Sequence, residues 1–580
     1  MLTAKKADFY GLGERFGLDP VIVRLIRNRD IVGEAAMEEY LYGSMKQLHD
    51  PHLMKGMDEA VRIIREKRDA GKKIRIIGDY DIDGICATYL LYRGLSRIGI
   101  KTDFMLPERV RDGYGMNCRM IDEAEADGID TIVTCDNGIA ACEPAAYAKK
   151  KGMTLIITDH HSIPVSEQGT PVLPEADTIL NPHQEDCGYP FKELCGAAVA
   201  YKLVCALYEA EGIPSEESEA LVEYAGFATV GDIMDLTGEN RILVKEGLRR
   251  LNHTKNIGLR ALIRENGLSE RKIMAYHIGF VLGPCLNAGG RLKTAHTSLS
   301  LLLAESEQEA AAIASELYQL NVQRKTLTEE GVLEADAQIT ENGWEKDPVL
   351  VVYLPDCHES IAGIIAARVK EKYYRPTLII TDGEDCVKGS GRSIEGYSMF
   401  EELQKCKELF LKYGGHPMAA GFSLKKEHIN RLRAALNENC RLTEEELTPK
   451  IMIDVAMPLH YISEKLIEEL EVLEPCGKKN EKPVFAEKNL KVLGARVLGQ
   501  NRNVLKFRVR NTAGCTMDAL YFGDIEELLA RIEQRYGPAQ VESMLQNRPN
   551  AVEFAAIYDP SINEYRGTRT VQIILRSVTL

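Results

Sequence analysis

The stretch from Arg75 to Leu91, RIIGDYDIDGICATYLL, crowds aspartates between a strand-like apolar run and a helix-like one. Asp79, Asp81 and Asp83 stand there at alternate positions. Like charges this close repel one another, and their ionised form is stable only where they face water or a cation. A solvated acidic turn and a cation site are therefore the two interpretations of this stretch.

Further carboxylates and imidazoles follow other strand-like runs. DTIVTCDNG ends in Asp136, and MTLIITDHH ends in Asp159, His160 and His161. In open α/β sheets, ligands bind beyond the carboxyl ends of the strands, so we expect these polar tips to converge in one crevice. Another acid, Asp232, closes the apolar stretch FATVGD, where a helix N-cap and a metal ligand are both open interpretations.

The combined set contains carboxylates and imidazoles but no thiolate: Asp79, Asp81, Asp83, Asp136, His160, His161 and Asp232. Such ligands suit Mn²⁺ or Mg²⁺ better than structural zinc, and the histidines favour Mn²⁺. The set is large enough for two ions. Two ions that share an aspartate can activate a water and stabilise both the attacking and the leaving oxygen of a phosphodiester. Phosphoryl transfer is therefore the predicted reaction class.

A parallel sheet covered by helices is expected to position these residues. From Lys73 to about Arg241, short β-rich runs alternate with amphipathic helices. The helix after the first acidic tip is predicted to begin right after Gly84, with its positive N-terminal end aimed at the crevice. Between about 241 and 340 the pattern is helical, and a long helix there is more typical of a connector between lobes than of a coiled coil.

A second α/β unit and a β-rich region are predicted beyond this connector. Strands are expected at PVLVVYL and PTLIIT, accompanied by Gly-rich segments such as KGSGRS and GGHPMAAGF. From about residue 450, alternating strands such as NVLKFRVRN predict a small β-barrel. Leu505, Phe507 and Val509 would face its core. The outer face of that strand would be basic, through Lys506, Arg508 and Arg510.

Composition indicates a multidomain globular protein. A chain of 580 residues is too long to fold around a single hydrophobic core, so several domains are expected. Its content of 45 % hydrophobic and 27 % charged residues is typical of soluble globular proteins. The N-terminus lacks an apolar signal region, and no apolar stretch reaches the roughly 20 residues that span a bilayer, so we expect a cytoplasmic protein with no membrane partner.

Cysteine usage and charge restrict the chemistry further. The 14 cysteines are scattered and never form C-x-x-C, which predicts reduced core thiols rather than a disulfide framework. The formal charge of −15 argues against simple nonspecific binding of polyanions. Any nucleic-acid partner would therefore be held by local basic clusters or by bound cations.

The order of the motifs resembles a known superfamily. DYDIDG, TCDNG, TDHH and ATVGDIMDL are similar to the four motifs of the DHH phosphoesterases. LGPCLNAGGRL, HESIAGIIAARVKEKYYRP, KGSGRSIEGYSMFEEL and YGGHPMAAGF resemble the RecJ branch of that superfamily. The resemblance runs from about Asp50 to the C-terminus.

The resemblance implies an α/β fold with two α/β lobes, DHH and DHHA1, whose sheets are parallel-rich. A long helix would join the lobes across a cleft, and an OB-like β-barrel would follow at the C-terminal end. The implied divisions are an N-terminal segment (1–50), a DHH catalytic domain (51–240), a helical connector (241–340), a DHHA1 substrate-binding domain (341–445) and an OB-fold nucleic-acid-binding domain (446–580).

The resemblance also implies a function. RecJ proteins are single-strand-specific 5′→3′ DNA exonucleases of recombination and repair that release mononucleotides and require Mn²⁺ or Mg²⁺. The implied partners are single-stranded DNA, a single-strand-binding protein and a RecQ-type helicase.

Motif by motif, the resemblance assigns roles to individual residues. The implied ligands of two metal ions are Asp79, Asp81, Asp83, Asp136, His160 and Asp232. Asp136, His160 and His161 would be catalytic, with His161 close to a metal or to the scissile phosphate. One departure is Ile77, where some superfamily members have a histidine, and Asp79 is the candidate to take that ligand's place.

Arginines in Gly-rich surroundings are the candidate phosphate ligands, because a guanidinium fork suits phosphate. By resemblance, Arg109, Ser390 and Arg392 would hold the 5′-terminal phosphate, and Arg291 an inner one. Two further residues are assigned to the substrate cleft. Tyr114 would either stack on a base or pack, and His416 would contact phosphate or serve as a structural hydrogen-bonding group.

Two other functions compete with this interpretation. The first is a DHH phosphodiesterase acting on oligoribonucleotides or cyclic dinucleotides, whose relatives generally lack the basic β-rich region found here after the second lobe. The second is a noncatalytic DNA-binding scaffold. Such a scaffold would be expected to have lost metal carboxylates, whereas every acidic motif of this chain is intact.

Overall fold

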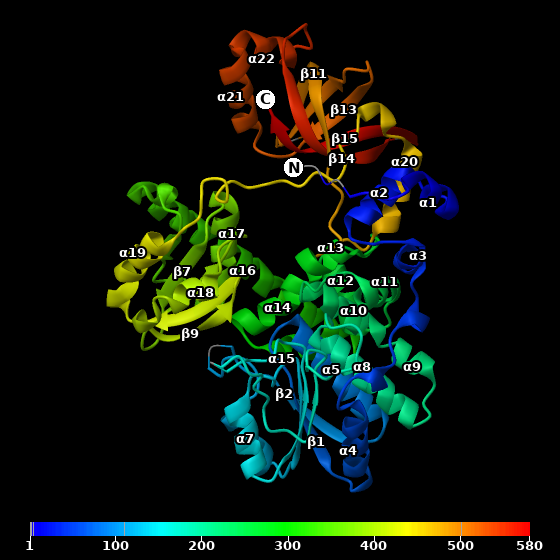
Figure 1. Ribbon diagram of the computed structural model, residues 1–580, viewed down its shortest axis with the longest axis vertical. Coiled ribbons are helices and arrows are strands. Elements are labelled where there is room, and N and C mark those ends of the chain that lie inside the picture. The colour runs from blue at the N-terminus through cyan, green and yellow to red at the C-terminus, as the bar shows by residue number, and fades with distance from the viewer. Residues whose placement is uncertain (1–2, 4, 110, 167, 500, 566) are drawn as a thin grey trace. The chain divides into compact units, whose positions relative to one another are not determined.

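The structure is a computed structural model that describes residues 3, 5–109, 111–166, 168–499, 501–565 and 567–580 (Figure 1). It forms two compact units. The larger comprises Met45–Met234 and Ile242–Pro449, and the smaller comprises Met1–Ser44, Asp235–Arg241 and Lys450–Leu580. Among the described residues, none of the helices combines the length and the apolar character needed to cross a bilayer.

The first sheet of the larger unit has five parallel strands in the order β2-β1-β3-β4-β5. They are β1 (Lys73–Ile77), β2 (Lys101–Met105), β3 (Thr131–Cys135), β4 (Thr154–Thr158) and β5 (Thr178–Leu180). Alternate residues of β3 point to opposite faces, so Val133 packs in one apolar cluster and Ile132 in another. The central strands are buried for this reason, as in other helix-covered parallel sheets.

Helices cover both faces of this sheet (Figure 1). On one face lie α4 (Met57–Asp69), α5 (Ile82–Arg97) and α8 (Gly196–Ala210), and on the other lie α6 (Cys118–Ala126) and α7 (Cys142–Lys150). The helix α5 begins at Ile82 rather than after Gly84. Its start is earlier than predicted because the Asp81 carboxylate caps it, accepting hydrogen bonds from the backbone N–H groups of Asp83 and Gly84.

A helical region follows the sheet and leads to the second lobe. Its elements are α9 (Ser215–Glu219), α10 (Val222–Gly231), α11 (Gly238–Leu251), α12 (Ile257–Glu265), α13 (Ala275–His277), the π-helical turn η3 (Ile278–Leu282), α14 (Gly283–Leu292), α15 (Ala295–Leu303) and α16 (Glu307–Asn342). The 36-residue α16 packs against α12, α14 and α15, and also against α17 (Glu359–Tyr373) of the second lobe. The predicted long connector is confirmed.

The second sheet is mixed and has the order β6-β7-β8-β10-β9. Its strands are β6 (Leu350–Tyr353), β7 (Thr377–Asp382), β8 (Val387–Arg392), β9 (Phe410–His416) and β10 (Ala419–Leu424), with α18 (Met399–Gln404) and α19 (Ile429–Asn439) beside them. Only β6 and β7 pair in parallel. The parallel-rich sheet expected in both lobes is therefore found in the first alone, because the short connections β7–β8 and β9–β10 allow only antiparallel pairing.

The smaller unit is built around a closed barrel with the strand order β11-β12-β13-β15-β14. The strands are β11 (Phe485–Leu498), β12 (Val504–Arg510), β13 (Thr516–Tyr521), β14 (Glu553–Tyr565) and β15 (Thr568–Thr579), accompanied by α20 (Glu464–Glu469), α21 (Ile525–Tyr536) and α22 (Pro538–Leu545). Leu505, Phe507 and Val509 are fully buried, which confirms the predicted alternation.

The N-terminal helices share the core of this barrel unit. They are α1 (Phe9–Phe16), α2 (Pro20–Asn28) and α3 (Glu34–Tyr42). Ile22 and Leu25 of α2 belong to the same apolar cluster as Phe485 and Phe507 of the barrel. Removal of the barrel would therefore expose the apolar side of α2.

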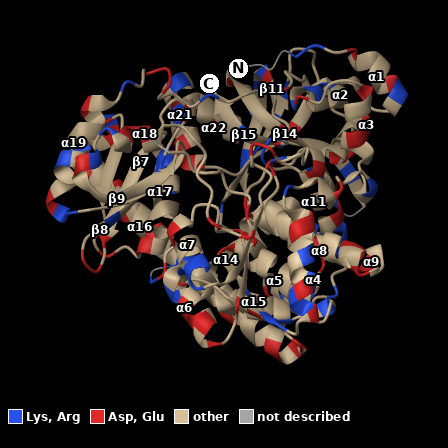
Figure 2. Ribbon diagram, turned by 60° about the horizontal axis from the view of Figure 1, so that its bottom comes forward, with Lys and Arg blue, Asp and Glu red and all other residues tan. Residues whose placement is uncertain are grey.

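The distribution of charged residues and the free state of the cysteines agree with what the composition predicts. In the view of Figure 2, acidic and basic residues alternate along the helices, and the basic residues do not gather in one region of the ribbon. A polyanion would thus be held by local clusters. All 14 cysteines are free, as predicted, and Cys86, Cys135 and Cys195 are among those that are buried.

Candidate metal centre and anion pocket

The carboxyl ends of three adjacent strands bring the acidic motifs together. Asp79 follows β1, Asp136 follows β3, and Asp159 to His161 follow β4. Because β1, β3 and β4 are neighbours in the sheet, these side chains meet at one edge, as the strand-tip argument predicts. The backbone of Asp136 is left-handed, with φ of 61°, a conformation typical of functional sites in a non-glycine residue.

The ligand atoms form three overlapping groups, and within each group they lie within 4.8 Å of one another. The first group contains Asp79, Asp81 and Asp136, and the second contains Asp83, His160 and Asp232. The third contains Asp136, Asp159, His160 and His161. Asp136 Oδ1 lies 3.1 Å from His160 Nε2, so Asp136 stands between the first two groups.

The second group is held by helix ends. His160 Nε2 lies 3.6 Å from Asp83 Oδ2 and 3.8 Å from Asp232 Oδ2. The Asp83 carboxylate accepts hydrogen bonds of 2.6 and 2.8 Å from the backbone N–H groups of Gly196 and Ala197, at the start of α8. Asp232 occupies the C-cap position of α10, so its interpretation as an N-cap is wrong.

Three carboxylate oxygens of this cluster have no hydrogen-bond partner in the part of the chain that the structure describes. Both side-chain oxygens of Asp79 and Oδ1 of Asp136 are buried without a hydrogen-bond partner among the described residues. Burial, followed by the charge of Asp81, raises the pKa of Asp79 well above its usual range. Burial and then the neighbouring aspartates do the same to the pKa of Asp136. Buried carboxylates without compensation are costly, so this oxygen-rich set fits hard divalent cations such as Mn²⁺ or Mg²⁺.

His161 is fixed beside the cluster by Asp159 and Tyr114. Its Nδ1 lies 2.7 Å from Asp159 Oδ1 and 3.1 Å from the Tyr114 hydroxyl, which donates a 2.6 Å hydrogen bond to the carbonyl of Asp136. Burial lowers the pKa of His161, but the hydrogen bond and the charge of Asp159 outweigh it and raise this pKa to about 9. The contact with Asp159 therefore favours the protonated form of His161 in the metal-free cluster.

Several positioning residues were missed by sequence reasoning. The Asn137 side chain donates hydrogen bonds to the carbonyls of Ile77 and Cys135, which ties β1 to β3. The side-chain oxygen of Asn287 in α14 accepts a 2.8 Å hydrogen bond from the backbone N–H of Ile82. Both asparagines lie inside motifs of the sequence, TCDNG and LGPCLNAGGRL. Only the structure shows which backbone groups their side chains hydrogen-bond.

Two glycines allow the acidic loop to pack closely. A Cβ at Gly78 would overlap the hydroxyl of Thr88, and a Cβ at Gly290 would overlap the carbonyl oxygen of Tyr80. Any side chain at these positions would displace the loop that carries Asp79 and Asp81.

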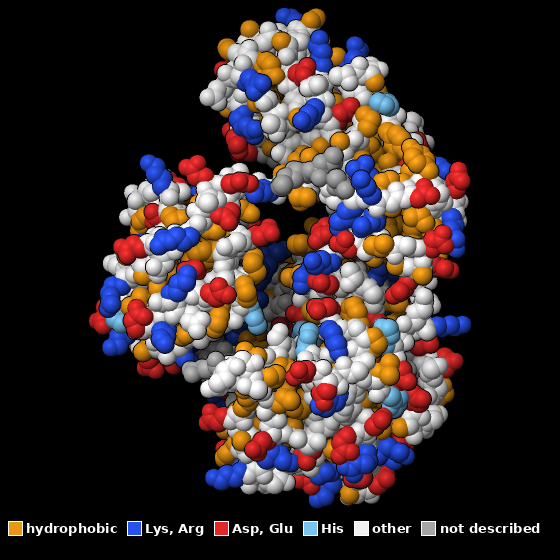
Figure 3. Space-filling view, viewed as in Figure 1, with side chains coloured by type: hydrophobic (Ala, Val, Ile, Leu, Met, Phe, Trp, Pro, Cys, Tyr) orange, Lys and Arg blue, Asp and Glu red, His pale blue; other side chains and the backbone are white. Residues whose placement is uncertain are grey.

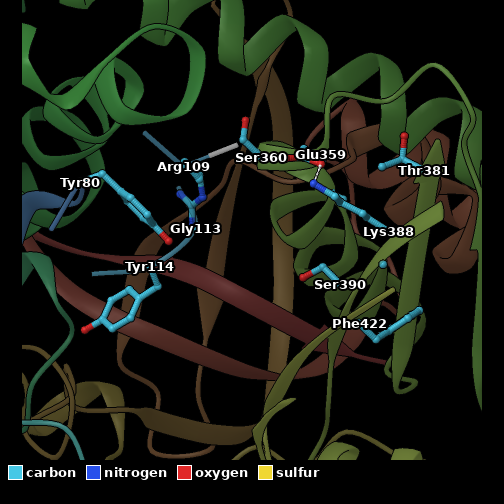
Figure 4. Close-up of a pocket in the computed structure, with 12 residues that line it drawn as sticks. Tyr80, Arg109, Gly113, Tyr114, Glu359, Ser360, Thr381, Lys388, Ser390 and Phe422 are labelled. Atoms are coloured by element: carbon cyan, nitrogen blue, oxygen red, sulfur yellow. Dashed lines mark ion pairs between the residues drawn. The ribbon is translucent and has the colours of Figure 1, made fainter. Parts of the chain in front are cut away.

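A cavity of about 260 Å³ opens beside the cluster (Figure 4). Tyr80, Arg109 and Tyr114 line it from the first lobe, and Lys388 and Ser390 line it from the second. The guanidinium of Arg109 lies 4.4 Å from the centre of the Tyr80 ring, and Lys388 Nζ forms a 2.6 Å ion pair with Glu359, the dashed line in Figure 4.

Two other predicted arginines bond to the walls of this cavity. Arg392 Nη1 donates to Ser390 Oγ at 3.1 Å, and Arg291 Nη1 donates to the carbonyl of Ser360 at 2.8 Å. Burial, and then the charge of Arg109, lower the pKa of Arg291 to about 10, so it remains protonated at neutral pH. Clustered guanidinium groups of this kind favour a phosphate. His416 is exposed at the end of β9 and is not among the residues that line the cavity.

Comparison with known proteins agrees with this geometry. Residues 73–231 match the N-terminal domain of the DHH family, residues 346–442 match the DHHA1 domain, and residues 453–577 match the RecJ OB domain. The single-stranded-DNA-specific exonuclease RecJ of Haemophilus influenzae is 31 % identical over 97 % of this chain and 97 % of its own length. The chain belongs to the RecJ family.

Other RecJ proteins support the assignment. RecJ of Escherichia coli is 30 % identical over 97 % of this chain and 96 % of its own length. RecJ of Bacillus subtilis is 34 % identical over 89 % of this chain, which spans 65 % of that relative. The crystal structure of RecJ from Thermus thermophilus in complex with Mn²⁺ matches with a TM-score of 0.80 and 26 % identity, over 100 % of this chain and 79 % of that one.

In this RecJ-family protein, Asp136→Asn is expected to reduce Mn²⁺-dependent hydrolysis of a phosphodiester substrate. The loss should exceed the roughly 10–100-fold typical of outer-shell partners, because the amide cannot supply carboxylate charge to both ligand groups. Asparagine tolerates the left-handed backbone at this position, so the fold should survive, as circular dichroism can check. Initial rates of nucleotide release measure the effect, with exposed Asp186→Asn as the matched control. Near-normal turnover of this variant would contradict the assignment of Asp136 as a ligand positioned between two ions.

Proposed function

We propose that this protein is a metal-dependent exonuclease that degrades single-stranded DNA in the 5′→3′ direction and releases 5′-mononucleotides, in DNA recombination and repair. The RecJ relatives are named single-stranded-DNA-specific exonucleases, which supports the substrate class. The observation that carries the proposal is the contiguity of the anion cavity and the carboxylate cluster. Tyr114 lines the cavity and also donates its hydroxyl hydrogen bond to Asp136.

Two divalent cations would occupy the carboxylate cluster. Their proposed ligands are Asp79, Asp81, Asp83, Asp136, His160 and Asp232. When bound, such ions lower the pKa of water and stabilise the oxygens of a phosphodiester. His161, which Asp159 keeps protonated, would donate a hydrogen bond to an oxygen of the scissile phosphate.

The anion cavity would set the direction of degradation, because a carboxylate cluster alone does not distinguish the two ends of a strand. Arg109, Ser390 and Arg392 would hold the 5′-terminal phosphate, and Arg291 an inner one. The cavity volume of about 260 Å³ is below the roughly 300–1,000 Å³ of typical small-molecule sites, which suits a terminal nucleotide rather than a longer segment. The Tyr114 ring, 48 % exposed, could stack on the terminal base.

The barrel would bind the single strand, with domain roles divided as the family resemblance implies: 51–240 for catalysis, 341–445 for the strand end and 446–580 for strand binding. Its β12 face is less basic than the sequence suggests, because Lys506 and Arg508 both pair with Asp518, at 2.6 and 2.7 Å. Arg510 remains an exposed cation of that strand. A cytoplasmic location, a single-strand-binding protein and a RecQ-type helicase as partners belong to the same proposal, supported by family membership.

The proposed function is tested by supplying Mn²⁺ and four substrates: a 5′-labelled single strand, a 3′-labelled single strand, a blunt duplex and a cyclic dinucleotide. The 5′ label should appear at once as a mononucleotide, while the 3′-labelled strand shortens gradually. The duplex and the cyclic dinucleotide should persist. Faster hydrolysis of the cyclic dinucleotide would instead support a phosphodiesterase, and early release of the 3′ label would reverse the polarity.

Arg392→Ala tests the end-recognition cavity. Loss of a charge-assisted contact costs about 1.5–3 kcal/mol, so digestion of 5′-phosphorylated strands should slow by about one to two decades. Strands with a 5′-hydroxyl should slow much less, which shrinks the preference between the two substrates. The ratio of the two rates is the measurement, because a folding defect lowers both together. Exposed Arg431→Ala of the same lobe is the control. An unchanged ratio of the two rates in folded Arg392→Ala would mean that another part of the protein binds the 5′ end.

A further inference from the structure

One loop borders both the anion cavity and the carboxylate cluster. It connects β2 to α6, and we call its described residues, 106–109 and 111–117, the cavity loop. Arg109, Gly113 and Tyr114 of this loop line the cavity. The cavity is lined from both lobes of the larger unit, and the molecular face in Figure 3 is hollowed between these lobes. One side of the cavity loop is thus available to a substrate.

The cavity loop is fastened to the end of β3 by two hydrogen bonds. The Tyr114 hydroxyl donates a 2.6 Å hydrogen bond to the carbonyl of Asp136. The backbone N–H of Met116 donates a 3.1 Å hydrogen bond to the side-chain oxygen of Asn137. Asp136 and Asn137 are the two residues that directly follow β3. Both bonds therefore end at the strand tip that supplies a candidate metal ligand.

Asn137 is a rigid anchor for this loop. Its side chain is fully buried, and its amide donates hydrogen bonds of 3.0 and 2.9 Å to the carbonyls of Ile77 and Cys135. Gly115 of the loop has a φ of 69°, and a Cβ at this position would lie 2.9 Å from the Asn137 Cβ. Only glycine allows this approach, so the loop is held in one position against the strand tip.

The backbone of Asp136 depends on such support. A left-handed conformation in a residue other than glycine persists only where surrounding contacts determine it, and the φ of Asp136 is 61°. Its N–H donates a 3.0 Å hydrogen bond to the carbonyl of Thr158, and its own carbonyl accepts the bond from Tyr114. A Cβ at Gly196 would lie 2.5 Å from the Asp136 Cβ, so the start of α8 packs tightly against it.

The Tyr114 side chain has two separate environments. Its ring is 48 % exposed and lines the cavity, where it packs edge-on against the rings of Tyr80 and His161, at 6.5 and 5.5 Å. In Figure 4 the hydroxyl points away from Lys388 and Ser390 of the second lobe. The ring is therefore available to a substrate, whereas the hydroxyl contacts the cluster.

We propose that Tyr114 is a positioning residue of the metal site: its hydroxyl, with Asn137 anchoring the loop, holds Asp136 in the conformation that directs its carboxylate at two ions. The inference rests on the proposed metal-dependent function. It gives the hydroxyl a role distinct from stacking of the ring on a base. Groups that orient metal ligands typically contribute 10–100-fold to metal affinity or activity. Loss of the hydroxyl should thus impair metal binding and turnover but leave strand binding unchanged.

Tyr114→Phe tests this role, because it removes the hydroxyl and keeps the ring. We expect kcat on a 5′-phosphorylated single strand at saturating Mn²⁺ to fall about 10-fold, with KM nearly unchanged. Calorimetric titration without DNA should show Mn²⁺ affinity about 10-fold weaker. Tyr114→Leu, which also removes the ring, should raise KM in addition. Tyr147→Phe is the matched control, because it removes a hydroxyl that donates a 2.8 Å hydrogen bond to Asp122 on α6.

A second variant tests the other attachment of the loop. Asn137→Ala removes the acceptor of the Met116 N–H and should lower kcat and Mn²⁺ affinity in the same direction. Both side chains act through Asp136, so the double variant should lose less than the product of the two single losses. Circular dichroism and Tm of each variant show whether it is folded, and Tyr114→Phe tests the proposal even where Asn137→Ala does not fold.

The outcomes separate this inference from the proposed function. A wild-type protein that neither binds Mn²⁺ nor digests single strands would contradict the proposed function itself. If the wild type does both, but Tyr114→Phe matches Tyr147→Phe in kcat and Mn²⁺ affinity, the inference is wrong. It is also wrong if Tyr114→Phe changes KM alone, which would assign the hydroxyl to the strand, or Tm alone, which would make it purely structural.

Discussion

Electrostatic repulsion among buried carboxylates is the constraint on which the rest of this structure depends. Asp79, Asp83 and Asp136 are at most 2 % exposed, yet they converge where strands β1 and β3 end and helix α5 begins. Within the described residues, no lysine or arginine forms an ion pair with Asp79 or Asp136, and neither carboxylate oxygen of Asp79 has a hydrogen-bond partner. Such a group is stable only with bound cations or with protons in their place. The cluster therefore makes sense as a site shaped for divalent ions.

The surrounding scaffold resists that repulsion. Helix α8 presents two backbone N–H groups to Asp83, Asp81 is held as the N-cap of α5, and Asn137 ties β1 to β3. These contacts hold the carboxylates in place, which is the preorganisation that a catalytic metal site requires. The second lobe then adds what the cluster lacks. Its Arg392 donates a hydrogen bond to Ser390, and together with Arg109 of the first lobe these residues make up the proposed site for a phosphate, next to the carboxylates proposed to hold metals.

Much of this arrangement could be predicted from the sequence, because the relevant signals are local. Polar residues at the ends of apolar runs converge wherever the runs form a parallel sheet, so the meeting of Asp79, Asp136 and His160 follows from strand order. The alternation around Phe507 likewise indicates the barrel core. The remainder depends on partners far apart in the chain. Local sequence patterns do not predict three of these features: the hydrogen bond that Asn287 accepts from the backbone of Ile82, the ion pair of Lys506 with Asp518, and the C-cap position of Asp232.

The central claim is that the carboxylate cluster exists to bind two divalent cations. Calorimetric titration of metal-free wild-type protein with Mn²⁺, combined with thermal unfolding of the same samples, tests it most directly. Ions that bind the folded state alone raise Tm as their concentration exceeds Kd. We predict two Mn²⁺ per chain and a Tm that rises with saturation. Binding of one ion or none, or a Tm that does not change at saturation, would contradict the account.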